Sequence, residues 1–287
     1  MAEIMVRSDD LELAAEAFGN PLDAALLLIM GVGGSMLLWP AAFCEKLASR
    51  GFYVLRYDNR DTGRSTLWPP GAPDYGVDEL AEDAISILDA FGVPRAHIVG
   101  LSMGGIVGQI AALAHPNRVL SLTLISSTKA LDAEPDLPPP TPPLLTFFSN
   151  TAPPDWNDRE AVIAYKIAGD LACNGSGHRF NEAAARASNE AEYDRARSIA
   201  SGVNHTMLGG GKRWEGHLAD IDAPMLVIHG DEDPLFPIAH GYSLAALKPD
   251  TPCVILKGTG HQFHQDDWQQ IIAAIVERTE TVPLKLP

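Results

Sequence analysis

Apolar runs alternate with helical patterns through the first 127 residues, and this order limits the chain to very few folds. Four apolar runs predict strands buried on both faces, at 24–30, 52–58, 96–101 and 119–127. The segments between them carry apolar residues at helical spacing, at 40–51, 76–92 and 103–115. Strands and helices that alternate with short links predict a mostly parallel sheet with helices on both faces.

The same pattern returns near the carboxyl terminus, after a long interruption. Two strands and two helices are predicted there, at 224–230, 238–247, 253–258 and 267–279. The interrupting residues, 131–215, begin proline-rich and continue with helical, polar stretches. We therefore expect one α/β core, formed by residues 1–130 and 216–287, with a helical cap inserted into it. Long insertions of this kind often cover active sites.

Acidic residues outnumber basic residues by 37 to 21, which gives the chain a formal net charge of −16. A nucleic-acid surface needs the opposite balance because it neutralises phosphates, and anionic membranes are disfavoured for the same reason. No apolar run approaches the ~20 residues that span a bilayer, and the first residues do not resemble a signal peptide. We expect a cytoplasmic monomer or homodimer that binds neither nucleic acid nor membranes.

The cysteines are three in number, Cys44, Cys173 and Cys253, and no two of them form a CxxC pair. This spacing is typical neither of a disulfide framework nor of a zinc site. We expect no metal and no cofactor.

The stretch GLSMG fits the pattern G-x-S-x-G around Ser102. The pattern is weak alone, and its simplest interpretation is a tight turn that happens to carry a hydroxyl. Its context is more specific, because it joins a predicted buried strand to a predicted helix. That arrangement holds a nucleophilic serine on a strained turn at the top of a parallel sheet. Ser102 is therefore our candidate nucleophile.

A serine nucleophile needs a general base, and an imidazole base needs a carboxylate partner. His261 follows the last predicted strand and therefore lies at the same sheet edge as Ser102. His264 is a weaker candidate because it falls near the start of a helix. Asp233 follows the strand at 224–230 and precedes a proline, and Asp231 is our second choice for the acid. The chain order serine, aspartate, histidine is the order found in α/β-hydrolases.

An oxyanion hole requires two N–H donors aimed at the negatively charged oxygen of the intermediate. The residue after the nucleophile supplies one donor, here the Met103 N–H. We assign the other to the Val32 N–H, in the glycine-rich loop after the strand at 24–30.

Five motifs in order, LLLIMGVGGSMLLWP, YDNRDTGRST, GLSMGG, DEDPLFP and GTGH, resemble the α/β-hydrolase superfamily over nearly the whole chain. They are most similar to aclacinomycin methylesterase-like carboxylesterases, in which serine-histidine-aspartate chemistry cleaves an ester under a helical cap. The resemblance implies that Asp58 and Arg60 brace a loop. Two positions depart from the common pattern, with Met30 in place of histidine and Asp61 in place of glycine.

These observations together predict a carboxylic ester hydrolase that acts on small to medium apolar esters through an acyl-enzyme. The expected substrate-binding residues border the glycine-rich loop: Met30, Gly31, Leu37, Leu38 and Trp39. Ordinary core packing is the competing interpretation for each of them. A lactonase, a perhydrolase or a C–C bond hydrolase could use the same triad. A non-catalytic binding protein on this fold is the alternative from another functional class.

Overall fold

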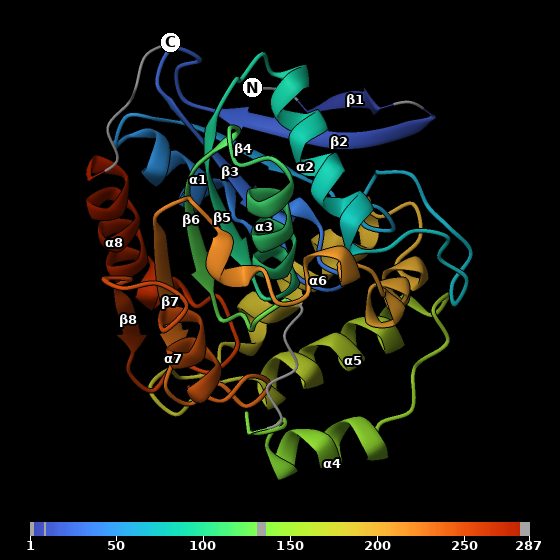
Figure 1. The fold of residues 1–287 in the computed structure, drawn as a ribbon. Coiled ribbons are helices and arrows are strands. Elements are labelled where there is room, and N and C mark those ends of the chain that lie inside the picture. The colour runs from blue at the N-terminus through green and yellow to red at the C-terminus, as the bar shows by residue number, and fades with distance from the viewer. Residues whose placement is uncertain (1–2, 9, 131–135, 282–287) are drawn as a thin grey trace.

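The computed structural model describes residues 3–8, 10–130 and 136–281, which form one eight-stranded sheet with helices packed against it (Figure 1). The order of the strands across the sheet is β1-β2-β4-β3-β5-β6-β7-β8. Their bounds are Ile4–Ser8 (β1), Leu11–Phe18 (β2), Ala24–Ile29 (β3), Phe52–Tyr57 (β4), Ala96–Leu101 (β5), Val119–Ile125 (β6), Met225–Gly230 (β7) and Cys253–Leu256 (β8).

The sheet is parallel from β4 to β8, whereas β1 and β2 form an antiparallel hairpin at one edge. The predicted α/β class and mostly parallel sheet are therefore confirmed. Side chains of β3 alternate between the two faces, with Leu26 and Leu28 in one core and Leu27 and Ile29 in the other. All of them are fully buried, which explains why the strand is a continuous apolar run.

Helices cover both faces of the sheet, as the alternating order predicts. On one face pack α1 (Ala41–Ala48) and α8 (Trp268–Glu280), which share a core with β3 through Phe43 and Ile271. On the other face pack α2 (Val77–Ala90), α3 (Met103–Ala114) and α7 (Ala239–Ala245). None of the helices in the described part of the chain is long and apolar enough to cross a membrane.

A long helical segment separates β6 from β7 and lies along the end of the sheet where the parallel strands finish (Figure 1). Its elements are α4 (Pro142–Asn150), α5 (Arg159–Ala172), α6 (Glu182–Arg195) and the short helices η2 (Ala200–Met207), η3 (Lys212–Trp214) and η4 (Leu218–Asp220). Residues 131–135, where the insertion was expected to begin, lie outside the described residues. The other short helices are η1 (Met36–Leu38) and η5 (Gln265–Asp267).

Candidate active site

Ser102 occupies a strained turn between β5 and α3. Its backbone has φ 54° and ψ −120°, a conformation that residues with a side chain rarely adopt. The flanking glycines permit this turn, because a Cβ at Gly100 would collide with the Gly104 carbonyl and one at Gly104 with the Ile29 carbonyl. The turn places Ser102 at the amino end of α3, where helix N–H groups favour negative charge.

The structure brings Ser102, His261 and Asp233 together from three loops that follow three different strands. His261 Nε2 lies 3.0 Å from Ser102 Oγ, and His261 Nδ1 lies 2.8 Å from Asp233 Oδ2. A carboxylate only accepts hydrogen bonds, so the Nδ1–H of His261 donates to Asp233. This leaves Nε2 with a free lone pair facing the serine hydroxyl, which is the tautomer that a general base requires.

Asp233 is held in place by its own loop and is almost fully buried. Its Oδ1 accepts the N–H groups of Leu235 and Phe236, both at 2.9 Å, so that Oδ2 remains for His261. Asp231 serves a different purpose: it accepts the Gly258 N–H at 2.6 Å and pairs with Lys257 at 2.9 Å. These contacts, led by the bond from Lys257, lower the pKa of Asp231. The second-choice acid therefore braces the loop instead of contacting the histidine.

His264, the weaker candidate base, makes no hydrogen bond to Ser102 among the described residues, and its contacts lie elsewhere. Its ring stacks on that of His178, with ring centroids 4.1 Å apart and planes within 4°. Its Nδ1 accepts the Asp266 N–H at 3.2 Å. The geometry therefore leaves His261 as the imidazole that reaches the serine.

Of the two expected oxyanion donors, Met103 directly follows Ser102, and Val32 directly follows Gly31, which approaches Ser102 closely. Within the part of the chain that the structure describes, no protein acceptor takes the N–H of Val32 or of Met103. Gly31 allows the loop to approach this closely, because a Cβ there would lie 3.1 Å from the Ser102 Cβ. Two N–H groups without a protein partner next to a serine hydroxyl can stabilise an oxyanion.

The expected substrate-binding residues separate into two groups by burial. Leu37 and Leu38 are half-buried, so these side chains are accessible. Met30 and Gly31 are buried. Trp39 is fully buried, and its ring packs edge-on against Phe263 with centroids 4.8 Å apart. The competing interpretation of core packing accounts for the position of Trp39.

Contacts from the inserted segment hold the glycine-rich loop. Glu192, on α6, accepts the Ser35 N–H at 3.1 Å and also the Ser35 hydroxyl. His205, on η2, accepts the Gly33 N–H at 3.0 Å through Nδ1 and donates from Nε2 to the Arg60 carbonyl at 2.7 Å. Burial lowers the pKa of His205, which keeps this ring neutral. The sequence contains no motif that identifies either residue.

A second part of the insertion packs on the loop that carries His261. The Cys173 carbonyl accepts the His261 N–H at 2.9 Å, and the Gly177 N–H donates to the Gly258 carbonyl at 2.8 Å. Close backbone approach is possible because this interface is rich in glycine, and a Cβ at Gly175 would collide with the Gly258 carbonyl. The inserted segment therefore contacts both loops that surround Ser102.

Asp58 and Arg60 brace the loop after β4. Asp58 is fully buried and accepts the N–H groups of Met36 at 2.8 Å and Arg64 at 2.9 Å. Arg60 makes a two-pronged pair with the buried Asp83, at 2.6 and 2.9 Å. Neither side chain contacts the serine, so their contacts are structural.

Comparison with known proteins finds a family, two relatives and a solved structure that each match most of the chain. The profile of the alpha/beta hydrolase fold family matches residues 24–267. Rhodomycin D methylesterase DauP of Streptomyces sp. (strain C5) is 34% identical, covering 96% of this chain and 97% of its own. Rhodomycin D methylesterase DnrP of Streptomyces peucetius is 32% identical over the same shares. A solved hydrolase structure from Pseudomonas aeruginosa PA01 is 28% identical with a TM-score of 0.71, covering 96% of this chain and 97% of that one.

Proposed function

We propose that this chain, which belongs to the α/β-hydrolase fold family and is an ester-hydrolysing enzyme, cleaves carboxylic esters through a covalent intermediate on Ser102. The observation that carries the proposal is the continuous chain of contacts from Ser102 Oγ through His261 to Asp233, at 3.0 and 2.8 Å. It matches the donor and acceptor roles that serine nucleophile activation requires.

In the first half of the reaction, His261 Nε2 accepts the Ser102 proton as Oγ attacks the ester carbonyl carbon. Negative charge then develops on the carbonyl oxygen, and the N–H groups of Val32 and Met103 stabilise it. When the tetrahedral intermediate collapses, the bond to the alcohol oxygen breaks and His261 donates its proton to the leaving alcohol. The acyl group remains on Ser102.

In the second half, His261 accepts a proton from water as the water oxygen attacks the acyl carbon. The second tetrahedral intermediate collapses, Ser102 takes back its proton from His261, and the carboxylic acid leaves. Asp233 holds His261 in one tautomer throughout and stabilises its cationic form.

We propose that residues 131–215 form a cap that shapes the substrate site, and that the substrate is a small to medium apolar ester. Contacts of Glu192 with Ser35 and of His205 with Gly33 support the cap, because they join this segment to the loop beside Ser102. The ring of Phe236 lies 5.6 Å from that of His261 and adds an apolar neighbour. Two relatives named as methylesterases favour a carboxylic methyl ester within this class.

A substrate panel on the wild type and on Ser102→Ala tests this proposal. The panel contains p-nitrophenyl esters of rising acyl length, bulky aromatic methyl esters and lactones. We expect linear esters to be hydrolysed by the wild type, with turnover lost in Ser102→Ala and kept in Ser49→Ala, which removes an exposed hydroxyl outside the proposed cap.

Other outcomes would replace the proposal with a named alternative. Faster turnover of lactones than of linear esters would identify a lactonase on the same triad. Equal ester hydrolysis by Ser102→Ala would show that Ser102 is not the nucleophile. Failure to turn over any member of the panel would favour the binding protein.

A further inference from the structure

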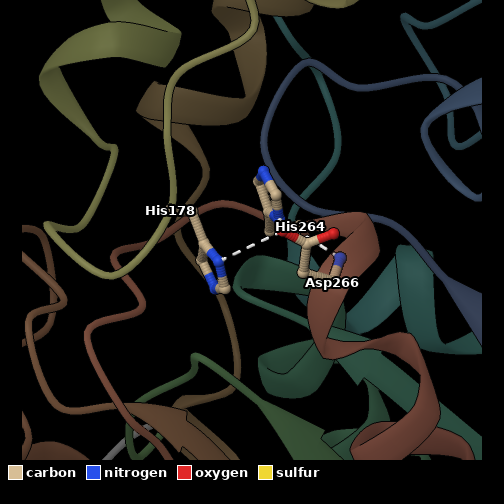
Figure 2. Close-up of side chains that lie close together, drawn as sticks. All are labelled: His178, His264 and Asp266. Carbon is tan, nitrogen blue, oxygen red and sulfur yellow. Dashed lines mark hydrogen bonds and ion pairs between the residues drawn. The ribbon is translucent and has the colours of Figure 1, made fainter.

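We propose that His178, His264 and Asp266 form a binding site for a divalent transition metal, of which zinc is the best match. The site is separate from the Ser102 site, and the proposal does not depend on the ester chemistry. His178 belongs to the inserted segment, whereas His264 and Asp266 follow β8. Figure 2 shows the three side chains close together, and their donor atoms all lie within 4.8 Å of one another.

Two of the three distances between donor atoms, those to the Asp266 carboxylate, are close to those of a metal site. Asp266 Oδ2 lies 3.7 Å from His178 Nδ1 and 3.7 Å from His264 Nδ1. In a tetrahedral zinc site with bonds of 2.0–2.2 Å, neighbouring donor atoms lie about 3.3–3.6 Å apart. The carboxylate needs to move only slightly, but the two rings must turn out of their stack, because the Nδ1 lone pair lies in the ring plane and the two planes are parallel within 4°. His264 gives up a long 3.2 Å bond from the Asp266 N–H in exchange.

The surroundings of His178 prepare its Nδ1 for a metal. His178 Nε2 lies 2.9 Å from Oδ2 of Asp267, a buried residue that also accepts the Thr259 hydroxyl at 2.9 Å. Because a carboxylate only accepts, Nε2 carries the proton and the Nδ1 lone pair stays free. In zinc sites, a ligating histidine usually donates its other ring N–H to a carboxylate in the outer shell of the metal.

The donor set also selects the class of metal. Two imidazole nitrogens and one carboxylate suit zinc and its neighbours among the transition metals, whereas magnesium and calcium prefer oxygen ligands alone. The Asp266 side chain is 72% exposed, so an ion can enter from solvent and keep water as its fourth ligand. Imidazole ligation predicts that zinc binds this site and that magnesium does not compete for it.

An ion here would join the inserted segment to the loop of His261. His178 follows the residues that pack on Gly258, and His264 lies three positions after His261. A ligand that binds only the folded state raises its stability, so zinc should raise the thermal unfolding midpoint. Stability therefore gives a readout that is independent of catalysis.

Zinc titration of the full chain tests the site, with calorimetry for binding and thermal unfolding for stability. We expect one zinc ion per chain, a rise in the unfolding midpoint and no displacement by millimolar magnesium. His178→Gln and Asp266→Asn should each weaken binding by about tenfold or more and remove the rise. His217→Gln is the matched control, because His217 pairs with Asp220 in a separate exposed cluster.

Two results would overturn the proposal. One is zinc affinity that Asp266→Asn and His178→Gln leave unchanged, since binding would then lie elsewhere, for example at His261 or a cysteine. The other is the lack of saturable binding to the wild type. Asp266 is exposed, so its variant should fold normally and keep the test decisive.

Discussion

The Gly33 N–H donates to His205 Nδ1 over 3.0 Å, and this bond joins the glycine-rich loop beside Ser102 to the inserted segment. His205 is buried and its Nε2 also donates to the Arg60 carbonyl. The ring therefore fixes two loops through both of its nitrogens. The Val32 N–H precedes this fixed point by one residue, so the position of the proposed oxyanion donor depends on a side chain that is distant in the sequence.

Replacing His205 with alanine should lower kcat more than it changes KM. The Gly33 N–H would lose its partner, at a cost of about 1–3 kcal/mol in stability, and the loop would shift. Small displacements of catalytic groups reduce turnover by about 10²-fold. Steady-state kinetics on a p-nitrophenyl ester checks this, with His217→Ala as the exposed control. Partial rescue by His205→Gln, which can still accept and donate, would separate positioning from simple packing.

Glu192 should act on the same loop through Ser35. Glu192→Ala leaves the Ser35 N–H and hydroxyl without their acceptor, so we predict a kcat lowered by roughly tenfold or more. Glu190 lies on the same helix but near Arg159 on the surface, and Glu190→Ala should retain near wild-type kcat. Equal rates for the two variants would show that the Glu192 contact does not position the loop.

The two aspartates after β7 should differ sharply in their effect on turnover. Asp233→Asn removes the acceptor that fixes the His261 tautomer, and the equivalent change in serine proteases costs about 10⁴ in kcat. Asp231→Asn alters a surface pair with Lys257 and should cost far less. Turnover numbers for the two variants decide the assignment, because a larger loss in Asp231→Asn would make Asp231 the acid.

Buried histidines should make the fold less stable as the solution becomes acidic. Burial lowers the pKa of His97 to about 4, whereas an unfolded histidine titrates near 6.5. Below pH 6.5, His97 therefore binds a proton in the unfolded chain and stays neutral in the folded chain until the pH approaches 4. Stability should fall as the pH drops from about 6.5 towards 4, by an amount on the order of 3 kcal/mol from this residue.

Urea unfolding at pH 7.5 and at pH 5.0 measures this effect. His97→Gln should show a smaller loss of unfolding free energy between the two values than the wild type does. The comparison between proteins is needed because burial also lowers the pKa of other histidines, including His205 and His229. The same loss in both proteins would mean that His97 does not contribute.

The sequence predicts the sheet and the loops after its strands well, because burial on both faces leaves a clear apolar pattern. Ser102, Asp233 and His261 each follow a strand, and parallel strands end at one sheet edge. Their proximity therefore follows from the strand order, although their distances required the structure. Trp39 shows the limit of reasoning from sequence position. It follows the glycine-rich loop in the sequence, which suggested a substrate-binding side chain, but the structure buries it among aromatic rings.

The contacts of the inserted segment could not be predicted in the same way. Glu192 and His205 lie in polar stretches of the sequence that show no hydrophobic periodicity. Their roles depend on how the inserted segment packs on the core. His178 and His264 are 86 positions apart, and no spacing motif connects them. These contacts arise from tertiary packing between segments whose own sequences carry no recognisable motif.

The nucleophile is the central claim, and an active-site-directed fluorophosphonate tests it most directly. Its phosphorus forms a bond to the attacking oxygen and releases fluoride, so the labelled peptide identifies the nucleophile by mass spectrometry. We predict one adduct per chain on the peptide that contains Ser102, ester hydrolysis lost in proportion to labelling, and no adduct in Ser102→Ala. An adduct on another residue, or a fully labelled chain that still hydrolyses esters, would contradict the account.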